Sequence, residues 1–254
     1  MGTPDNFRVN DDDGIRTITI DRPEAKNALT AAMRTELCGA LAVADRDPAV
    51  RAVILTAVDP VFCAGVDFKE QRAPGWNAYD QQFAVNPGKA LRSMSTPVIC
   101  AVNGACVSGG LEVALSSTFV VASERARFAD THARLGVVAA WGLTALLPRA
   151  VGVRKATEMS ITGNFVDADE ALRIGLVNHV VAHEELGAFA RHLAADVAAT
   201  PAVGEVLALY RRGEGRSLAE ALAFEADHTS RRAHDPAAFA ALGRETAARG
   251  HRAE

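Results

Sequence analysis

Three short apolar runs constrain what this chain of 254 residues can fold into more than any other feature. They are RAVILTA at 51–57, PVICAV at 97–102 and STFVVA at 117–122. Runs of this length that alternate with helical segments are typical of buried strands in a largely parallel sheet. The sequence therefore predicts an α/β fold in which helices connect the strands.

The segments around these runs support the same fold class. Residues 15–20 (IRTITI) alternate between apolar and polar side chains and predict a further strand, which Asp21, Arg22 and Pro23 close. Thr30 is a predicted N-cap, and a helix after it ends at Asp47-Pro48. The apolar face of that helix is formed by Met33, Leu37, Leu41 and Ala44.

The second half of the chain is predicted to be mostly helical. The polar residues 69–88 predict a mobile loop that leads into a helix near 87–94. Asp167 with Glu170 predicts a capped helix start. After residue 142 the pattern predicts helices at 142–150, 153–161, 168–174 and 184–199, followed by three more.

Composition excludes several classes of protein. The formal net charge is −4, and about half of the residues are apolar, which argues against a nucleic-acid binder with a basic face. No apolar run approaches the roughly 20 residues that span a bilayer, and residues 1–10 lack the pattern of a signal peptide. The four cysteines show no metal-binding spacing and predict reduced thiols and a cytoplasmic location. We expect no metal site.

Two glycine-containing turns follow two of the predicted strands. They are VFCAGVDFK at 61–69 and NGACVSGGLE at 103–112. The backbone N–H groups of Val66 and Gly109 could bind one oxygen together, as an oxyanion hole does. Each turn taken alone is also compatible with a purely structural role. The turn NGACVSGG is not a phosphate-binding loop, because the lysine and the glycine spacing of those motifs are missing.

These motifs resemble the enoyl-CoA hydratase/isomerase family, the crotonase superfamily. The resemblance rests on FCAGVDFK, on NGACVSGGLEVALSS, on ARFADTHARLGVVAAWGLTALLPRAVG and on the opening TITIDRPEAKNALT. It runs from about residue 13 to residue 182 in the right order and is weaker after residue 200.

The resemblance implies a spiral of ββα turns with two roughly perpendicular sheets, and a helical C-terminal region that forms trimers or dimers of trimers. It implies a division into an acyl-CoA-binding core at 1–200 and an oligomerisation region at 201–254. It implies that Val66 and Gly109 hold the carbonyl of a coenzyme A thioester, with no further cofactor. The segments 26–28 and 64–68 would line the path of coenzyme A, which assigns substrate contacts to Lys26, Ala28, Ala64, Asp67 and Phe68.

The resemblance also gives Glu112 a role. The residue follows Gly109 by one helical turn, where family hydratases keep a catalytic glutamate. Its apolar neighbours should raise its pKa toward the working pH, which suits an acid–base group. The competing interpretation is a glutamate stabilised by the helix N-terminus.

The chain departs from the family pattern at two places. His132 stands where two-glutamate hydratases have their second glutamate, and imidazole can also orient water or move a proton. Asp130, two residues away, is a candidate to orient it. Ala139 and Ala140 replace a common Pro-Gly pair. Trp141 stands in the place of a small residue, and its side chain either shortens or reshapes the acyl pocket or belongs to the core.

Three functions remain open from the sequence. The first is a hydratase that adds water to a trans-2-enoyl-CoA, with Glu112 as the main acid–base group and His132 as its partner. The second is an enoyl-CoA isomerase, which can work with a single carboxylate. The third is an acyl-CoA-binding protein that has lost catalysis. The C-terminal helices have few large apolar groups, so we expect a homo-oligomer that covers them.

Overall fold

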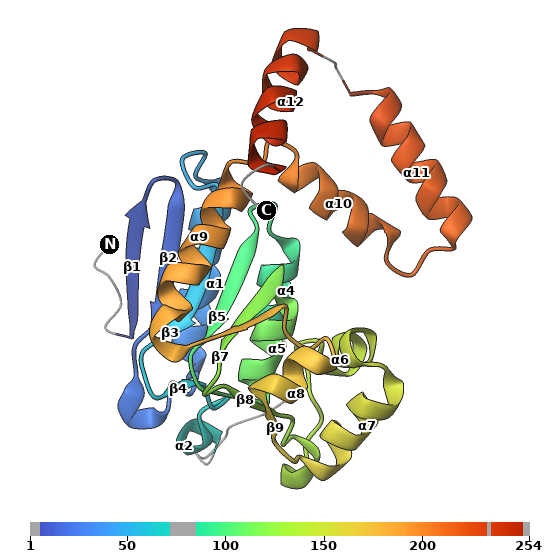
Figure 1. Cartoon of the computed structure of the whole chain (residues 1–254). Helices are drawn as coiled ribbons and strands as arrows, with labels where there is room; N and C mark the ends of the chain where they lie inside the picture. The colour runs from blue at the N-terminus through green and yellow to red at the C-terminus, as the bar shows by residue number, and fades with distance from the viewer. Residues whose placement is uncertain (1–5, 72–84, 233–234, 251–254) are drawn as a thin grey trace. The chain divides into compact units, whose positions relative to one another are not determined.

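The computed structural model describes residues 6–71, 85–232 and 235–250 (Figure 1). The chain divides into two compact units, residues 1–204 and residues 205–254. The first unit contains all the strands among the described residues as well as the candidate site, and the described part of the second unit is helical.

A six-stranded sheet forms the centre of the first unit, in the order β1-β2-β3-β5-β7-β10. The strands are β1 (Phe7–Asp12), β2 (Ile15–Ile20), β3 (Ala52–Ala57), β5 (Val98–Val102), β7 (Phe119–Ser123) and β10 (His179–Val181). β1 is antiparallel to β2, and the remaining neighbours are parallel. The four strands that the sequence predicts, β2, β3, β5 and β7, are confirmed within two residues at each end.

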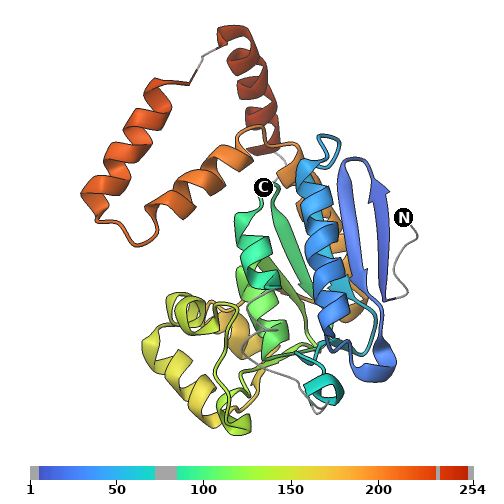
Figure 2. The ribbon, with the colours of Figure 1, turned by 180° about the vertical axis from the view of Figure 1, so that it is seen from behind.

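Both faces of the central strands of this sheet are buried, which explains why these strands are continuously apolar. On β3, Val53 and Leu55 face one hydrophobic cluster, whereas Ala52 and Ile54 face the other. Helix α9 (Leu186–Ala198) covers one face (Figure 1). Helices α1 (Ala31–Arg46), α4 (Pro87–Ser93) and α5 (Gly109–Ser116) cover the opposite face (Figure 2).

A second sheet of four short strands has the order β4-β6-β8-β9. Its strands are β4 (Val61–Cys63), β6 (Ala105–Val107), β8 (Arg127–Ala129) and β9 (Val166–Asp167). Each of β3, β5 and β7 is followed by one strand of this small sheet. A helix then follows β4 and β6, namely α2 (Phe68–Gln71) and α5. This repeated ββα order confirms the predicted fold class.

The predicted helix caps are present. The Met33 N–H donates to the Thr30 side chain at 3.2 Å, where α1 begins. The Glu170 N–H donates to Asp167 at 2.9 Å, where α8 (Ala168–Arg173) begins. The predicted helices at 142–150 and 153–161 are α6 (Leu143–Val151) and α7 (Val153–Thr162). Most of the loop predicted at 69–88 lies outside the described residues.

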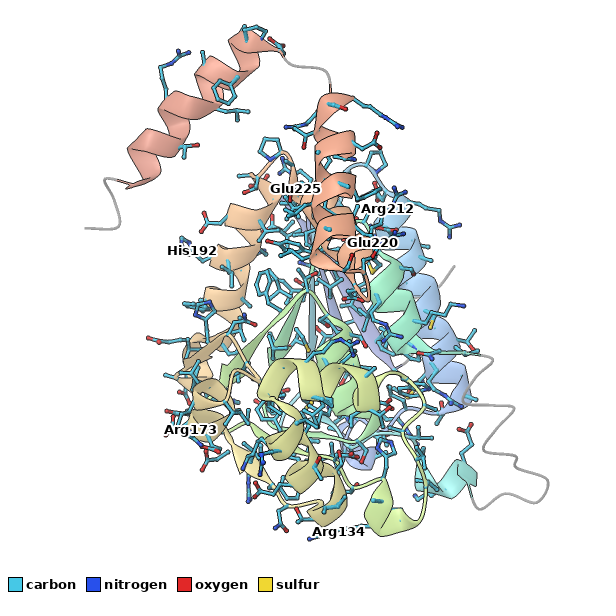
Figure 3. The ribbon with its side chains drawn as sticks, turned by 90° about the vertical axis from the view of Figure 1, so that its right-hand side faces the viewer. Arg134, Arg173, His192, Arg212, Glu220 and Glu225 are labelled. Atoms are coloured by element: carbon cyan, nitrogen blue, oxygen red, sulfur yellow. The ribbon has the colours of Figure 1, made fainter. Side chains whose placement is uncertain are left out.

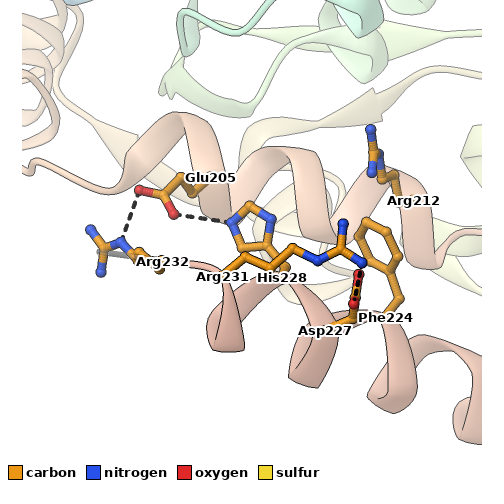
Figure 4. A pocket seen from close by; sticks show the side chains of 7 residues that line it. All are labelled: Glu205, Arg212, Phe224, Asp227, His228, Arg231 and Arg232. Carbon is orange, nitrogen blue, oxygen red and sulfur yellow. Dashed lines mark hydrogen bonds and ion pairs between the residues drawn. The ribbon is translucent and has the colours of Figure 1, made fainter. Parts of the chain in front are cut away.

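The second unit holds α11 (Leu218–Ser230), α12 (Pro236–Gly250) and most of α10 (Val203–Gly213). None of the described side chains on these helices is buried. A cleft between α10 and α11 contains ion pairs from Glu205 to His228 and Arg232 (Figure 4). Charged side chains also cover the surfaces of both units, for example Arg173 and Glu225 (Figure 3).

No single helix within the described ranges has the length and apolar character of a membrane span. The bent helix pair at 183–198 and 203–213 reaches them only when its two parts are taken together.

Candidate active site

The carboxyl group of Glu112 is buried on the first turn of α5, where the residue is 2% exposed. Its Oε1 accepts hydrogen bonds from the backbone N–H groups of Trp141 at 2.6 Å and Leu143 at 3.3 Å. Burial raises the pKa of Glu112 above its ordinary 4.5, and it outweighs the opposing effects of His132 and of the two backbone donors. Because Oε1 is engaged by two donors, a proton on this carboxyl group belongs on Oε2.

The other oxygen of Glu112 faces His132. Oε2 lies 3.8 Å from His132 Nε2, which is longer than a direct hydrogen bond. The two residues come from α5 and from the segment after β8, so the fold brings together two side chains that are 20 positions apart in the chain. Both side chains are largely buried, with 3% and 14% of their surface exposed.

Asp130 lies on the other side of the imidazole ring. Its Oδ1 is 2.7 Å from His132 Nδ1 and also accepts the backbone N–H of His132 at 3.1 Å. Burial by itself would raise the pKa of Asp130, but hydrogen bonds from His132 and Ser160 hold that pKa below its ordinary value. Asp130, His132 and Glu112 therefore form a line of three titratable side chains.

Ser108 connects this line to the start of α5. Its backbone lies at φ 49° and ψ −108°, which is unusual for a residue other than glycine. Its hydroxyl is 2.7 Å from that of Thr131 and accepts the Thr131 N–H at 3.1 Å. Its own N–H donates to the Ala129 carbonyl at 2.9 Å. The sequence analysis singled out neither Ser108 nor Thr131, because no local pattern marks this pairing.

The turn at 64–68 is held by a short parallel bridge between Leu29 and Val66. The Leu29 N–H donates to the Gly65 carbonyl at 2.8 Å, and the Asp67 N–H donates to the Leu29 carbonyl at 3.1 Å. In a parallel bridge of this kind, the N–H of the intervening residue points away from the partner strand. The N–H of Val66 is therefore directed away from Leu29.

The two glycine turns touch one another. A Cβ atom at Gly65 would lie 3.2 Å from the Gly109 nitrogen, and Gly65 has φ +96°. A Cβ atom at Gly109 would lie 3.4 Å from the Gly65 Cα. Within the ranges that the structure describes, neither the Val66 N–H nor the Gly109 N–H has an acceptor. Two backbone donors on adjoining turns are what an oxyanion hole requires.

Trp141 is both a core residue and a neighbour of this turn. It is 2% exposed, and its ring would be 3.0 Å from a Cβ atom at Gly109. Arg92 donates to the Trp141 carbonyl at 2.7 Å and to the Ser116 hydroxyl at 2.8 Å. The Arg34 guanidinium lies 5.8 Å from the Trp141 ring centroid. The sequence analysis did not single out either arginine.

The segments 26–28 and 64–68 lie side by side. The Ala64 N–H donates to the Lys26 carbonyl at 3.1 Å, and Lys26 is exposed. Arg22 donates to the Ala28 carbonyl at 3.0 Å and to the Asp67 carboxylate at 2.6 Å. The carboxylate of Asp67 is thus engaged by Arg22. The side chain of Phe68 lies outside what the structure describes.

The residues that the structure describes contain no group of three or more His, Cys, Asp and Glu side chains arranged to hold a metal ion. Cys63, Cys100 and Cys106 are buried thiols. Burial raises the pKa of Cys63 to about 12.

The repeated ββα order, the two adjoining glycine turns and the buried glutamate one helical turn after the second agree with the family that the sequence motifs resemble. The sequence model of the family described as "Enoyl-CoA hydratase/isomerase" matches residues 10–236. The chain belongs to the enoyl-CoA hydratase/isomerase family.

Individual relatives agree with this assignment. A probable enoyl-CoA hydratase of Rhizobium meliloti is 38% identical over 212 residues, which cover 82% of each chain. The 1,2-epoxyphenylacetyl-CoA isomerase of Escherichia coli is 32% identical over 197 residues, which cover 75% of each. A crystal structure of a putative enoyl-CoA hydratase/isomerase from Mycobacterium abscessus superposes with a TM-score of 0.87 at 36% identity, covering 95% of this chain and 96% of that one.

Proposed function

We propose that the protein is an enoyl-CoA hydratase, which adds water across the 2,3 double bond of a trans-2-enoyl-CoA thioester. One observation carries the proposal. A buried carboxyl group on Glu112 lies one helical turn from the Gly109 N–H, and its Oε2 faces an imidazole nitrogen at 3.8 Å. The name of the Rhizobium meliloti relative, a probable enoyl-CoA hydratase, supports the same reaction.

The two backbone donors polarise the thioester. The N–H groups of Val66 and Gly109 bind the carbonyl oxygen, which draws electron density from the double bond and makes Cβ electrophilic. When water adds to Cβ, the negative charge moves to the carbonyl oxygen of an enolate. Donors fixed by the backbone stabilise this charge without reorganisation, and each one typically contributes roughly 3–4 kcal/mol.

Glu112 and His132 handle the water. A water molecule in contact with both Glu112 Oε2 and His132 Nε2 is held between two groups that exchange protons. As the water oxygen bonds to Cβ, one of its protons passes to Glu112, and Cα of the enolate then takes up a proton. The hydrogen and hydroxyl that end on the substrate sum to one water molecule. A single carboxyl group can therefore take up a proton and return it.

The proposal assigns different weights to the two residues. Glu112 is anchored by two backbone hydrogen bonds and belongs to the same helix as Gly109, so its position relative to the carbonyl is fixed. His132 replaces a second carboxylate and assists as a water-orienting or proton-transferring partner. The reaction needs no cofactor, because coenzyme A is part of the substrate.

Isomerisation is the second candidate reaction, because it can work with a single carboxylate, and Glu112 is the carboxylate on the Nε2 side of the imidazole. An isomerase moves a proton between carbon atoms and needs no positioned water. An absorbance assay at the enoyl-thioester band, with crotonyl-CoA and longer 2-enoyl-CoAs, separates the candidates. Loss of absorbance supports hydration, whereas its appearance from a 3-enoyl-CoA supports isomerisation. No turnover of either substrate leaves the acyl-CoA-binding function.

The remaining substrate contacts follow from the same proposal. The segments that contain Lys26, Ala28, Ala64 and Phe68 would line the path of coenzyme A, and Trp141 would limit the acyl pocket near Gly109. Because its carboxylate is paired with Arg22, Asp67 would contribute through its backbone and by holding the turn at 64–68 in place.

We also propose that the protein is a homo-oligomer, a trimer or a dimer of trimers. Helices α10 to α12 bury none of their described side chains, and Tyr210, Leu218 and Phe239 are at least 68% exposed. Val138, six positions after His132, is 77% exposed. Large contiguous apolar patches on a protein surface mark sites of interaction with a partner. A cytoplasmic location fits the buried reduced cysteines.

A further inference from the structure

The Asp130 carboxylate lies directly behind His132, on the ring nitrogen opposite to the one that faces Glu112. The Nδ1 contact to Asp130 is 2.7 Å, and the Nε2 distance to Glu112 is 3.8 Å. Asp130 is 3% exposed, so it contacts the ring from within the protein. The reaction described above uses His132 and Glu112 but gives Asp130 no task.

The hydrogen-bond chemistry of Asp130 fixes the tautomer of His132. An ionised carboxylate can only accept hydrogen bonds, and the contacts of Asp130 favour its ionised form. The hydrogen in the 2.7 Å contact therefore belongs to Nδ1. In the neutral imidazole the other nitrogen is then an acceptor, so Nε2 offers a lone pair to the water beside Glu112.

Asp130 is itself held from several directions, which makes it suitable for this task. Its Oδ1 accepts both the ring and the backbone N–H of His132, so one oxygen orients two parts of the same residue. Ser160 on α7 hydrogen-bonds to the carboxylate. Thr131, between the two residues, is bound to Ser108 at the start of α5.

We propose that Asp130 is a positioning residue of the hydration site, which keeps His132 in the Nδ1–H tautomer with Nε2 directed at the water beside Glu112. This inference rests on the proposed function. Asp130 touches neither the water nor the acyl group and acts only through His132. Its removal therefore cannot cost more activity than the removal of the imidazole itself.

Two variants separate charge from orientation. In D130N the amide oxygen can still accept both His132 N–H groups, and the Ser160 hydroxyl can accept from the amide nitrogen. Only the charge is lost, and we expect kcat/KM to fall about 5- to 10-fold, the difference between a charge-assisted and a neutral hydrogen bond. In D130A both contacts are lost, and kcat/KM should fall toward the value of H132Q.

A double variant tests whether the effect passes through the imidazole. In an H132Q background, D130N should cause no further loss of kcat/KM. Asp59 offers a matched control, because it pairs with His183 Nε2 at 3.1 Å elsewhere in the first unit. D59N makes the same chemical change to a carboxylate–imidazole pair and should leave kcat/KM unchanged. Multiplicative losses in the double variant would overturn the proposal.

A spectroscopic measurement tests the proposal without turnover. Nitrogen-15 NMR of the His132 ring, at a pH where the ring is neutral, reports which nitrogen carries hydrogen. Wild type and D130N should show the Nδ1–H tautomer, and D130A should show exchange between both tautomers. An unchanged tautomer in D130A would refute the positioning role even if the wild type hydrates enoyl-CoA. The expected change in a protein without turnover would instead refute only the hydratase function.

Discussion

Replacing Glu112 by glutamine removes the proposed acid–base group and leaves the hydrogen bonds around it nearly unchanged. The amide oxygen can take the place of Oε1 and accept the N–H groups of Trp141 and Leu143, which lie 2.6 and 3.3 Å from Oε1 in the wild type. The amide nitrogen then takes the place of Oε2 and can donate toward His132. The variant also removes a carboxyl group that burial makes costly to ionise, so its free energy of unfolding should not decrease at neutral pH.

The expected loss of activity follows from the role of the carboxyl group. A positioned acid–base group typically contributes about 10²- to 10⁴-fold to the rate, which corresponds to about 2.7–5.4 kcal/mol of activation free energy. We therefore expect Glu112→Gln to lose about that much of kcat for crotonyl-CoA hydration. The affinity for an acyl-CoA should remain, because the backbone donors of Val66 and Gly109 are untouched.

The assay compares steady-state hydration rates of four variants. His132→Ala should lose less than Glu112→Gln, since it removes the assisting group. His132→Glu restores the two-carboxylate arrangement and can exceed His132→Ala if its carboxylate reaches the water. Glu158→Gln makes the same chemical change at a side chain that is 59% exposed, and this control should leave the hydration rate unchanged. A Glu112→Gln enzyme with near-normal hydration would refute the mechanism.

Four further predictions concern the turn, the pH dependence, the ligand and the assembly. Gly110→Ala should lower the free energy of unfolding by about 1–3 kcal/mol or more, because its Cβ would lie 2.4 Å from the Cys63 carbonyl oxygen. Gly187→Ala, whose Cβ would meet nothing within 4 Å, is the control, and denaturant unfolding measures both. Because burial raises the pKa of Glu112, kcat/KM should rise with pH through a midpoint above 4.5 as this base ionises. The contribution of protonated Glu112 to the free energy of unfolding should be lost over the same rise in pH. A pH–rate profile with its midpoint at or below 4.5 would contradict this prediction. Calorimetry should show that an acyl-CoA binds and that the matching free acid does not bind comparably; equal binding would contradict the assignment of the ligand. Light scattering at micromolar concentration should show an oligomer, and a monomer would contradict the role given to residues 205–254.

The sequence predicted four of the six strands of the large sheet, β2, β3, β5 and β7, and none of the four strands of the small sheet. The runs at 51–57 and 97–102 are apolar because both faces of β3 and β5 are covered, so their pattern is continuous and easily detected. The strands β4, β6 and β8 have three residues each, which is too short for a period to emerge. β1 was also missed, since only Phe7 of its six residues is buried.

The site was predictable where one short segment carried the signal. Gly109 and Glu112 lie on one helix turn, so their spacing alone placed them together. The contacts of Ser108 with Thr131 and of Arg92 with Trp141 join positions 23 and 49 residues apart. Such contacts depend on how segments distant in the chain pack together, and no local pattern in the chain encodes them.

In the proposed site the donors at positions 66 and 109 belong to the backbone, whereas Glu112 and His132 act through their side chains. This difference has a consequence for which substitutions the site tolerates. Every residue type except proline supplies an N–H, so position 66 can vary in its side chain while its donor persists. Position 109 cannot vary in the same way, because a Cβ there would press to within 3.0 Å of the Trp141 ring. Under the proposed function, the donor at position 66 thus tolerates most side-chain substitutions, whereas the donor at position 109 and the pair formed by Glu112 and His132 do not. Under the same proposal, the residue at position 132 can change during evolution while both backbone donors for the carbonyl are kept.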